Sequence, residues 1–368
     1  MMLKLFDLSL KLSGFPIEEG KKQFEEILAV PKSDYEGFID KKKTEIVNFH
    51  LQNNSFYSEL NGSGTFNNWN DLPVLTKKNL QKPLSERLSK GYSEKNVFLN
   101  KTSGSSGEPF IFAKDKHAHA VTWASIIYRF GWFGVDFNTS YQARFYGIPK
   151  DFIGYRKERL KDFLSKRYRF SIFDLSDEIL EGFLKHFRTK KFDYINGYTS
   201  SIVLFAKFLK QKKIILKDIC PTLKVCMATS EMLFEADKLL LETQFGIPIV
   251  NEYGASELDL IAFQNAEGEW QVNAETLFVE ILDDDDQPVP NGKEGRIVIT
   301  SLFNKAHPFI RYDIGDIGIL DEKSMLKKPI LKQLIGRTND VAVLPSGKKS
   351  PGLTFYYVTK SIIEDDGT

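Results

Sequence analysis

The stretch Leu223–Asn251 reads LKVCMATSEMLFEADKLLLETQFGIPIVN. Its first part, Leu223–Ala228, is a short apolar run that is typical of a buried strand, and helical spacing of apolar residues follows over Ser230–Phe245. A second apolar run, Pro248–Asn251, predicts another strand. A strand, a helix and a strand in this order predict two parallel strands that are joined by a covering helix.

The same alternation extends toward the N-terminus. Tyr141–Tyr146 is a predicted strand, 176–188 a helix, Tyr194-Ile195 the end of a strand, and Thr199–Lys212 a helix. The region therefore predicts an α/β fold, with βαβα layers around a parallel sheet.

The flanking regions have a different character. Residues 1–60 and 116–133 are expected to be helical, and Val97–Asn100 and Ile111–Ala113 are expected to be strands. Beyond Gly254, short strands joined by turns predict an antiparallel β unit; they are Thr276–Ile281, Gly295–Thr300 and Ile317–Leu320. The acidic run in Asp283–Gly292 lacks the ligand spacing of an EF-hand, so it is interpreted as a polar hairpin turn.

Composition limits the class of protein. The chain has 368 residues, 42% hydrophobic and 27% charged, with a net charge of +1, so no overall basic field indicates nucleic acid binding. Cys220 and Cys226 form no disulfide framework and are expected to be buried thiols in a reducing cytoplasm. No apolar run approaches the ~20 residues that span a bilayer, so no membrane partner is expected. The basic stretch Arg156–Arg169 is interpreted as a solvated helix face.

A loop rich in glycine and hydroxyl residues lies between the strands predicted at 97–100 and 111–113. Its residues Thr102, Ser103, Gly104, Ser105, Ser106 and Gly107 can direct backbone N–H groups and hydroxyls toward one phosphate. A flexible loop is the alternative interpretation. The loop has neither the Gly-Lys-Ser/Thr ending of a P-loop nor a G-x-G-x-x-G pattern, which excludes both of those nucleotide sites.

Three further motifs follow in the chain. Asn251-Glu-Tyr-Gly-Ala-Ser-Glu257 lies at the end of a predicted parallel strand, where ligands collect in open α/β sheets. Ile310–Asp316 places an aspartate after a glycine, where its carboxylate could accept hydrogen bonds from two ribose hydroxyls. Gly336–Asp340 contains Arg337, which could reach a ribose or a phosphate. Each of these motifs taken alone is also compatible with an ordinary turn.

In this order, the four motifs resemble those of the adenylate-forming (ANL) superfamily of acyl-CoA synthetases. The resemblance covers roughly residues 70–352 and is greatest to the phenylacetate–CoA ligase family, including its CapK-like branch associated with capsular polysaccharide biosynthesis. It implies an acyl-CoA synthetase-like large N-terminal domain and an AMP-forming acid–thiol ligase. Such an enzyme joins a carboxylic acid to ATP, which gives acyl-AMP and pyrophosphate, and then transfers the acyl group to coenzyme A.

The resemblance also implies residue roles. Thr102–Gly107 would hold phosphates, and Thr102, Ser103 and Glu257 would act in catalysis, with Glu257 as the Mg²⁺ ligand. The segment around Ser230 and Glu231 would line the adenine. The remaining nucleotide contacts would come from Asn251, Glu252, Tyr253 as the stacking ring, Gly254, Ser256, and Asp316 with its partner Arg337. Tyr146, Gly147 and Tyr198 would line the acyl pocket, and Asn339 and Asp340 would form a hinge.

The chain departs from the family pattern at its end. None of Lys348, Lys349 and Lys360 lies at the late position of the family's catalytic lysine, so the small C-terminal domain is expected to be largely missing. No cysteine or histidine occurs in Leu258–Val272, so no structural zinc is expected. The implied organisation is a large domain over 1–335, with parts 1–95, 96–255 and 256–335, and a hinge with a truncated domain start over 336–368.

Three functions remain open at this stage. The first is the acid–CoA ligase, with ATP, Mg²⁺ and coenzyme A, acting on a small carboxylic acid that could be an aryl acid. The second shares its adenylation step but passes the acyl group to a protein or an amine. The third is a nucleotide-binding chain without catalysis. The oligomeric state is open as well, and a dimer is one option.

Overall fold

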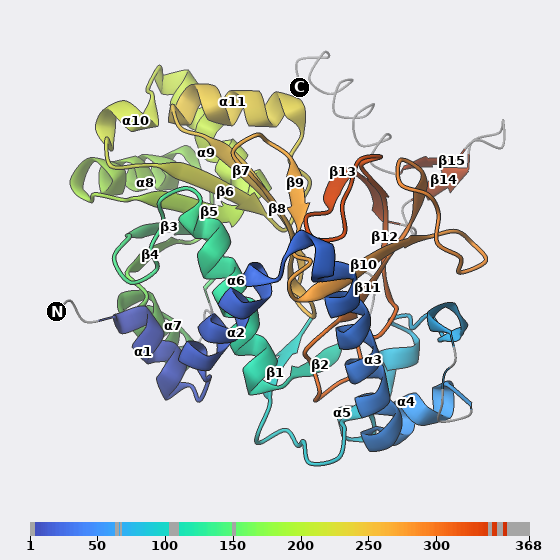
Figure 1. Ribbon diagram of the computed structural model, residues 1–368. Coiled ribbons are helices and arrows are strands. Elements are labelled where there is room, and N and C mark those ends of the chain that lie inside the picture. The colour runs from blue at the N-terminus through green and yellow to red at the C-terminus, as the bar shows by residue number, and fades with distance from the viewer. Residues whose placement is uncertain are drawn as a thin grey trace. The chain divides into compact units, whose positions relative to one another are not determined.

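The computed structural model describes residues 4–62, 66, 68–102, 110–148, 152–337, 341–343 and 349–351. Their backbone forms two compact units (Figure 1). Unit 1 comprises residues 1–25 and 120–270, and unit 2 comprises residues 26–119 and 271–368. Each unit is therefore built from two separate segments of the chain. The predicted boundary between a large domain and a hinge at 335/336 stays a prediction.

Unit 1 is built on a sheet whose strands follow the order β8-β7-β6-β5-β3-β4. The strands β4, β3, β5, β6 and β7 run parallel, and β8 is antiparallel to β7. This arrangement confirms the α/β class expected from the alternating pattern. The bounds are β3 Gln142–Phe145, β4 Arg167–Phe170, β5 Tyr194–Tyr198, β6 Val225–Thr229, β7 Ile249–Ala255 and β8 Asp259–Gln264.

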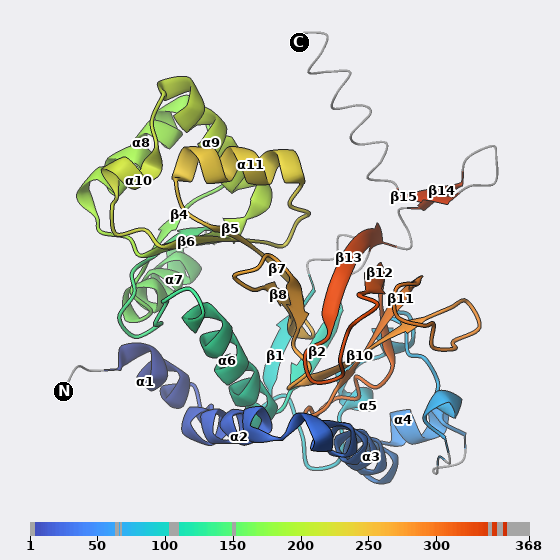
Figure 2. The same cartoon turned by 45° about the horizontal axis from the view of Figure 1, so that its top comes forward.

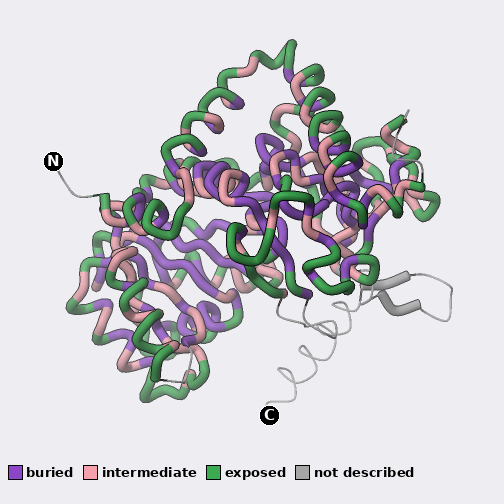
Figure 3. Tube along the Cα trace, turned by 90° about the horizontal axis from the view of Figure 1, so that it is seen from below, coloured by how far each residue is buried: buried purple, intermediate pink, exposed green. Residues whose placement is uncertain are grey.

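Helices cover both faces of this sheet (Figures 1 and 2). One face carries α8 Asp177–Thr189, α9 Thr199–Lys212, α10 Leu216–Ile219 and α11 Glu235–Phe245. The other face carries α6 Lys116–Gly131 and α7 Phe152–Leu164, with α1 Leu5–Leu12 beside them. Most residues of the strands are accordingly buried, and the strands appear largely purple in Figure 3, while the helices alternate between exposed and buried residues.

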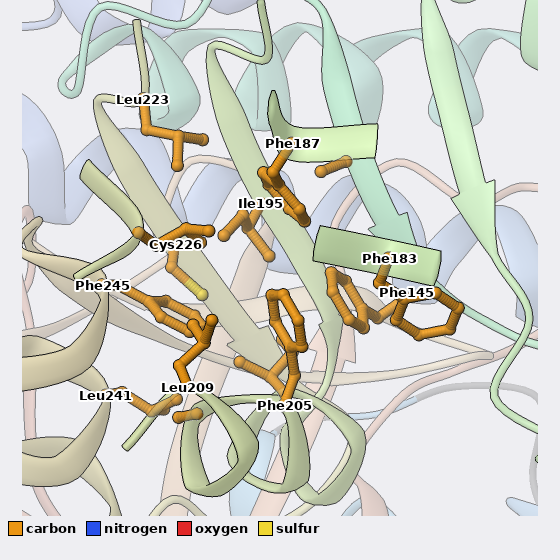
Figure 4. Close-up of a cluster of buried hydrophobic side chains, with 14 of the residues drawn as sticks. Phe145, Phe183, Phe187, Ile195, Phe205, Leu209, Leu223, Cys226, Leu241 and Phe245 are labelled. Atoms are coloured by element: carbon orange, nitrogen blue, oxygen red, sulfur yellow. The ribbon is translucent and has the colours of Figure 1, made fainter. Parts of the chain in front are cut away.

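The core under α8, α9 and α11 is a cluster of phenylalanine rings (Figure 4). Phe205 of α9 is fully buried, and its ring centroid lies 5.6 Å from that of Phe187 and 5.6 Å from that of Phe145. Cys226 of β6 points into the same cluster, as does Phe245 of α11. Both cysteines are free and buried, as predicted.

The opposite face of the sheet packs against α6. The Phe130 ring lies 5.3 Å from that of Phe263 in β8 and 6.1 Å from that of Tyr194 in β5. The strands β5, β6 and β7 contact apolar side chains on both faces, so β6 and the start of β7 read as continuous apolar runs rather than as alternating ones. This property made them recognisable from the sequence.

Unit 2 contains the helices α3 Tyr35–Asn53, α4 Ser55–Leu60 and α5 Leu84–Arg87, and α2 Ile17–Ala29 spans the boundary at Glu25. Its antiparallel strands follow the order β10-β11-β12-β13, which confirms the expected antiparallel β unit. Their bounds are β10 Leu277–Leu282, β11 Glu294–Ser301, β12 Tyr312–Leu320 and β13 Ile330–Arg337. The short elements are η1 Lys32–Asp34, η2 Trp69–Asp71, η3 Asn79–Gln81, β1 Phe98–Lys101, β2 Ile111–Lys114, β9 Trp270–Val272, β14 Val341–Val343 and β15 Lys349–Pro351.

The acidic run after β10 is part of a hairpin connection, as predicted. The Asp283 carboxylate accepts hydrogen bonds from the backbone N–H groups of Asp285 and Gln287, at 3.0 and 2.9 Å. Arg296 of β11 donates to the Asp286 carboxylate at 2.5 Å. The aspartates therefore act as turn and ion-pair residues.

Two interpretations of the sequence are wrong. The helix expected over Ser230–Phe245 begins only at Glu235, because Ser230 adopts a left-handed backbone with φ of 71°. The basic stretch Arg156–Arg169 is not one solvated helix face, since it runs from α7 into the strand β4, where Arg169 is buried. A helix was expected within this stretch, but the bounds of α7 and the strand β4 were not predicted.

We expect Phe205→Ala to lower the free energy of unfolding by about 3–5 kcal/mol, because it removes a fully buried ring from the phenylalanine cluster and leaves a cavity. Urea denaturation measures this change. Leu204→Ala is a matched control one position earlier on α9, where the side chain is 45% exposed, and it should cost less than about 1 kcal/mol. Equal losses in the two variants would contradict the placement of this core.

Candidate functional site

Three neighbouring parallel strands of unit 1 bring their carboxyl-terminal residues into register. Tyr198 of β5 pairs with Thr229 of β6, and Thr229 pairs with Glu252 of β7. Phe145, the last residue of β3, pairs with Gly197, which lies one residue before Tyr198 on β5. In open α/β sheets, ligands bind beyond this edge, so the residues there form the candidate site.

Two tyrosines predicted to line an acyl pocket meet at this edge. The rings of Tyr146 and Tyr198 lie 4.9 Å apart, centroid to centroid, at an interplanar angle of 52°. Burial raises the pKa of Tyr146 to about 12, and its hydroxyl is in hydrogen-bond contact with Ser230. The phenol is therefore neutral at physiological pH. Gly147, the third predicted pocket residue, has little free space, since a Cβ there would lie 3.0 Å from the Phe173 ring.

Glu252 lies beside this pair in a network that the sequence did not reveal. The Thr229 hydroxyl donates to Glu252 Oε1 at 3.2 Å. Burial raises the pKa of the Glu252 carboxyl to about 7, although the hydrogen bond from Thr229 and the charge of Arg144 oppose the shift. This carboxyl can therefore gain or lose a proton near neutral pH.

Arg144 was not predicted as a site residue. Its guanidinium carbon lies 4.0 Å from the centroid of the Tyr146 ring, and burial lowers its pKa. Within the described part of the chain, its Nε is buried without a hydrogen-bond partner. The i, i+2 spacing of Arg144 and Tyr146 could have indicated this contact, because it places both side chains on one face of an extended chain.

Ser230 and Glu231, which were expected near the adenine, leave the same edge but differ in what they contact. The Glu231 carboxylate accepts a hydrogen bond of 2.6 Å from the backbone N–H of Ser200, in the first turn of α9. A carboxylate at this position satisfies a free N–H group and stabilises the helix dipole. Glu231 thus fixes the link between β6 and α9.

The heptad Asn251–Glu257 is mostly strand rather than a turn. The strand β7 continues to Ala255 and forms an antiparallel hairpin with β8, with an irregular register between Tyr253 and Gly254. Gly254 is required at this position, because a Cβ there would lie 2.5 Å from the Asp259 carbonyl oxygen. The backbone N–H of Asn251 donates to the Gln264 side chain at 2.9 Å.

Tyr253, the predicted adenine-stacking ring, is 8% exposed, and its ring lies nearly parallel to that of Trp270 at 6.1 Å. Ser256 and Glu257 follow β7 in the turn before β8, and Glu257 is 7% exposed. A buried carboxylate is a suitable hard oxygen ligand for Mg²⁺ when phosphate oxygens complete the coordination. Across the described residues, no group of three or more histidine, cysteine or acidic side chains could hold a metal by itself.

The glycine loop joins two antiparallel strands of unit 2, as expected. Lys101 pairs with Ile111, and the next residue, Thr102, exchanges hydrogen bonds with Phe110. The predicted phosphate-binding residues Ser103, Gly104, Ser105, Ser106 and Gly107 lie outside the described residues. The described residues therefore show the hydrogen bonds between Thr102 and Phe110, which join the two ends of the loop.

A buried arginine anchors the exit of this loop. Arg87 of α5 donates to the Ile111 carbonyl at 2.8 Å, and its guanidinium lies 5.0 Å from the centroid of the Phe110 ring. It also contacts the ring nitrogen Nε2 of His307, whose pKa is lowered by burial and by the arginine charge. A neutral imidazole can accept this hydrogen bond. No pattern in the sequence indicates this contact between Arg87 and His307.

Asp316 and Arg337, predicted as partners, are directly opposite each other on β12 and β13. The motif that contains Asp316 is therefore part of a strand, and Gly315 before it adopts a left-handed φ of 82° within that strand. Asp316 is 7% exposed. The Arg337 side chain and the hinge residues Asn339 and Asp340 lie outside the described residues.

No protein-family model matches the chain, but two curated proteins do. Protein CapK of Staphylococcus aureus is 25% identical over 318 residues, which are 80% of this chain and 66% of CapK. The phenylacetate–coenzyme A ligase of Aromatoleum evansii is 28% identical over 131 residues, which are 33% of this chain and 29% of the ligase. The chain is thus similar to CapK and to a phenylacetate–coenzyme A ligase, in agreement with the resemblance of its motifs.

The fold of the chain is also found in solved structures. A 2-hydroxyisobutyryl-CoA ligase in its postadenylation state superposes with a TM-score of 0.70 at 15% identity, over 88% of this chain and 71% of the ligase. The predicted acyl-CoA synthetase-like fold is thus confirmed. The chain spans less than two thirds of the length of the curated relatives that it matches.

The raised pKa of Glu252 predicts a specific pH dependence. Its folded-state pKa of about 7 exceeds the ordinary value of 4.5, so its stabilising contribution is complete below pH 4.5 and is lost as pH rises through about 7. Glu252→Gln should therefore gain stability relative to the wild type between pH 5 and pH 8. Urea unfolding across this range measures the difference. The exposed Glu267→Gln is the control, and parallel pH profiles for all three proteins would refute the assigned environment.

Proposed function

We propose that this protein is an AMP-forming acid–thiol ligase. It activates a small carboxylic acid with ATP and passes the acyl group to coenzyme A. The main support is the strand-edge arrangement, in which Tyr198, Thr229 and Glu252 lie in register with Tyr146 beside them. The four motifs in family order and the similarity to CapK and to phenylacetate–CoA ligase give independent support.

In the adenylation step, a carboxylate oxygen of the acid attacks the α-phosphorus of ATP. A bond from this oxygen to phosphorus forms, the bond from the α-phosphorus to the bridging oxygen breaks, and pyrophosphate leaves with the electron pair. Two anions meet in this step, so the protein must supply positive charge and hydrogen-bond donors in a fixed arrangement. Thr102, Ser103 and the rest of the loop to Gly107 are the proposed phosphate donors. Glu257 would hold Mg²⁺, which would neutralise phosphate charge.

The remaining roles are those that the resemblance to the family implies. Tyr253 and the segment at Ser230 would contact the adenine, and the pair Asp316 and Arg337 would hold the ribose. Tyr146 and Tyr198 would line the acyl pocket. Two aromatic rings at this position favour an aryl acid or a short acyl acid, because a flat or small substrate can pack against their faces. In the second step the CoA thiolate attacks the acyl carbon, and AMP leaves.

Pyrophosphate release from ATP tests this function, measured over a panel of aryl and short-chain acids with and without coenzyme A. The ligase predicts release that requires an acid, together with an acyl-CoA product when CoA is present. Acid-dependent release with hydroxylamine as acceptor but no acyl-CoA would favour the alternative with a protein or amine acceptor. If calorimetry detects ATP binding but no acid causes the release of pyrophosphate, the result favours the alternative of a nucleotide-binding chain without catalysis.

Glu257→Gln should lower the rate of adenylation on the order of 100-fold, because it removes the negative charge that holds the metal. Folding should be preserved, since the substitution keeps the size of the side chain. Rates of pyrophosphate release at several Mg²⁺ concentrations measure the effect, with Glu267→Gln as the exposed control. If the variant and the wild type have equal rates at low Mg²⁺, the proposed role of Glu257 as a metal ligand is wrong.

A further inference from the structure

The helix α7, Phe152–Leu164, has its polarity reversed relative to an ordinary surface helix. It buries the carboxylate of Asp162, whose side chain is only 4% exposed. It exposes large apolar side chains, which are Phe152 at 69%, Ile153 at 78%, Leu160 at 60% and Phe163 at 74%. Surface helices normally place their apolar residues inward, so this arrangement needs a physical cause.

The inward face is explained by the edge strand β4, which presents two arginines. Arg169 donates to Glu158 Oε2 at 2.7 Å and to Asp162 Oδ1 at 2.9 Å. Arg167 donates to the same oxygen of Asp162 at 2.5 Å. Buried cations require paired anions, so α7 has to turn its two carboxylates toward the sheet. Its apolar residues are thereby left on the other side.

The outward face of α7 is mainly apolar. At 100° per residue, Phe152, Ile153, Leu160 and Phe163 fall within one third of the helix circumference. The neighbouring helix α1, which contacts α7, also exposes apolar side chains, which are Leu8 at 41% and Leu12 at 77%. The two helices lie side by side in Figures 1 and 2. Full burial of one such side chain is worth about 1.5–3 kcal/mol, so covering this face would be strongly favourable.

Cations accompany the apolar residues. Arg156 lies between Phe152 and Leu160 around the helix, and its guanidinium is 4.5 Å from the centroid of the Phe152 ring. Lys157 is also exposed, and within the described residues neither it nor Arg156 has a carboxylate partner. The acids of the helix are held by the β4 arginines, with Glu158 also bound to Lys161. The apolar surface thus contains one cation without a carboxylate partner, Arg156, and is bordered by another, Lys157.

We propose that the outward face of α7 binds an anionic lipid surface. Aromatic and aliphatic side chains enter the boundary between headgroups and acyl chains, while arginine and lysine contact the phosphates. A second copy of the chain fits this face less well, because a twofold interface would oppose the same cations. Interfacial binding requires no membrane-spanning segment, and among the described helices none is long and apolar enough to cross a bilayer.

Cosedimentation with vesicles tests the proposal. The wild-type chain is mixed with vesicles of phosphatidylcholine, and separately with vesicles of equal parts phosphatidylcholine and phosphatidylglycerol. Binding to the anionic vesicles should be at least about tenfold stronger, and it should weaken as salt is added, because each basic residue near the surface contributes about 1 kcal/mol. Equal binding to both vesicles, or no binding to the anionic ones, would overturn the proposal.

Variants separate the apolar and charged contributions. Ile153→Ser with Phe163→Ser should reduce binding to anionic vesicles by at least about tenfold, because two inserted side chains are lost. Lys157→Gln should reduce it by about fivefold. The control is Leu239→Ser on α11, where the side chain is 63% exposed on the other face of the sheet. Unchanged binding by the double variant would refute the proposal.

Light scattering tests the alternative that a second copy of the chain covers the outward face of α7. The wild type and the double variant should have the same mass in the absence of lipid, and unfolding by urea should be similar, since the replaced side chains are exposed. If the wild type is a dimer and the double variant is a monomer, the outward face of α7 binds a second copy of the chain instead. The readout is a binding constant and a mass, so the result does not depend on whether the protein is a ligase.

Discussion

Burial of the parallel strands on both faces is the constraint on which unit 1 depends. With phenylalanines of α8 and α9 on one side and α6 on the other, the strands β3, β5, β6 and β7 cannot offer a binding surface along their faces. Their carboxyl ends are where side chains can leave the sheet and meet a ligand. The pairing of Tyr198, Thr229 and Glu252 is a direct result of the parallel register. The core thus determines where the site lies, and the residues at the strand ends determine its chemistry.

The sequence predicted the elements that local pattern specifies. The strand β6 and the helix α9 follow from continuous apolar runs and helical spacing, and the glycine loop was placed correctly between two strands. It did not predict contacts between distant segments. The pairing of Thr229 with Glu252 and the contact of Arg87 with Ile111 join residues that only the fold brings together. The left-handed Ser230 also escaped prediction, because serine carries no signal for a positive φ.

The reversed polarity of the helix α7 was not predicted, for a related reason. A pattern of apolar and charged residues indicates which side chains share a face, but not which face is buried. Here two arginines on β4 decide the question, because they draw Glu158 and Asp162 inward. The expectation of no membrane partner considered only segments that span a bilayer. An interfacial helix is a different kind of structure, and its signature became visible only when burial was assigned to each residue.

The construction of each unit from two chain segments affects how the protein is made. Phe6 of α1 packs against Trp123 and Phe137, with ring centroids 5.2 and 4.9 Å apart, and all of the residues from 26 to 119 are synthesised in between. At about 5–20 residues per second, the first helix waits on the order of 10 s on the ribosome before its partners emerge. During that time its apolar side chains are uncovered. The helix α1 therefore completes its packing only after the segment that carries Trp123 and Phe137 has left the ribosome.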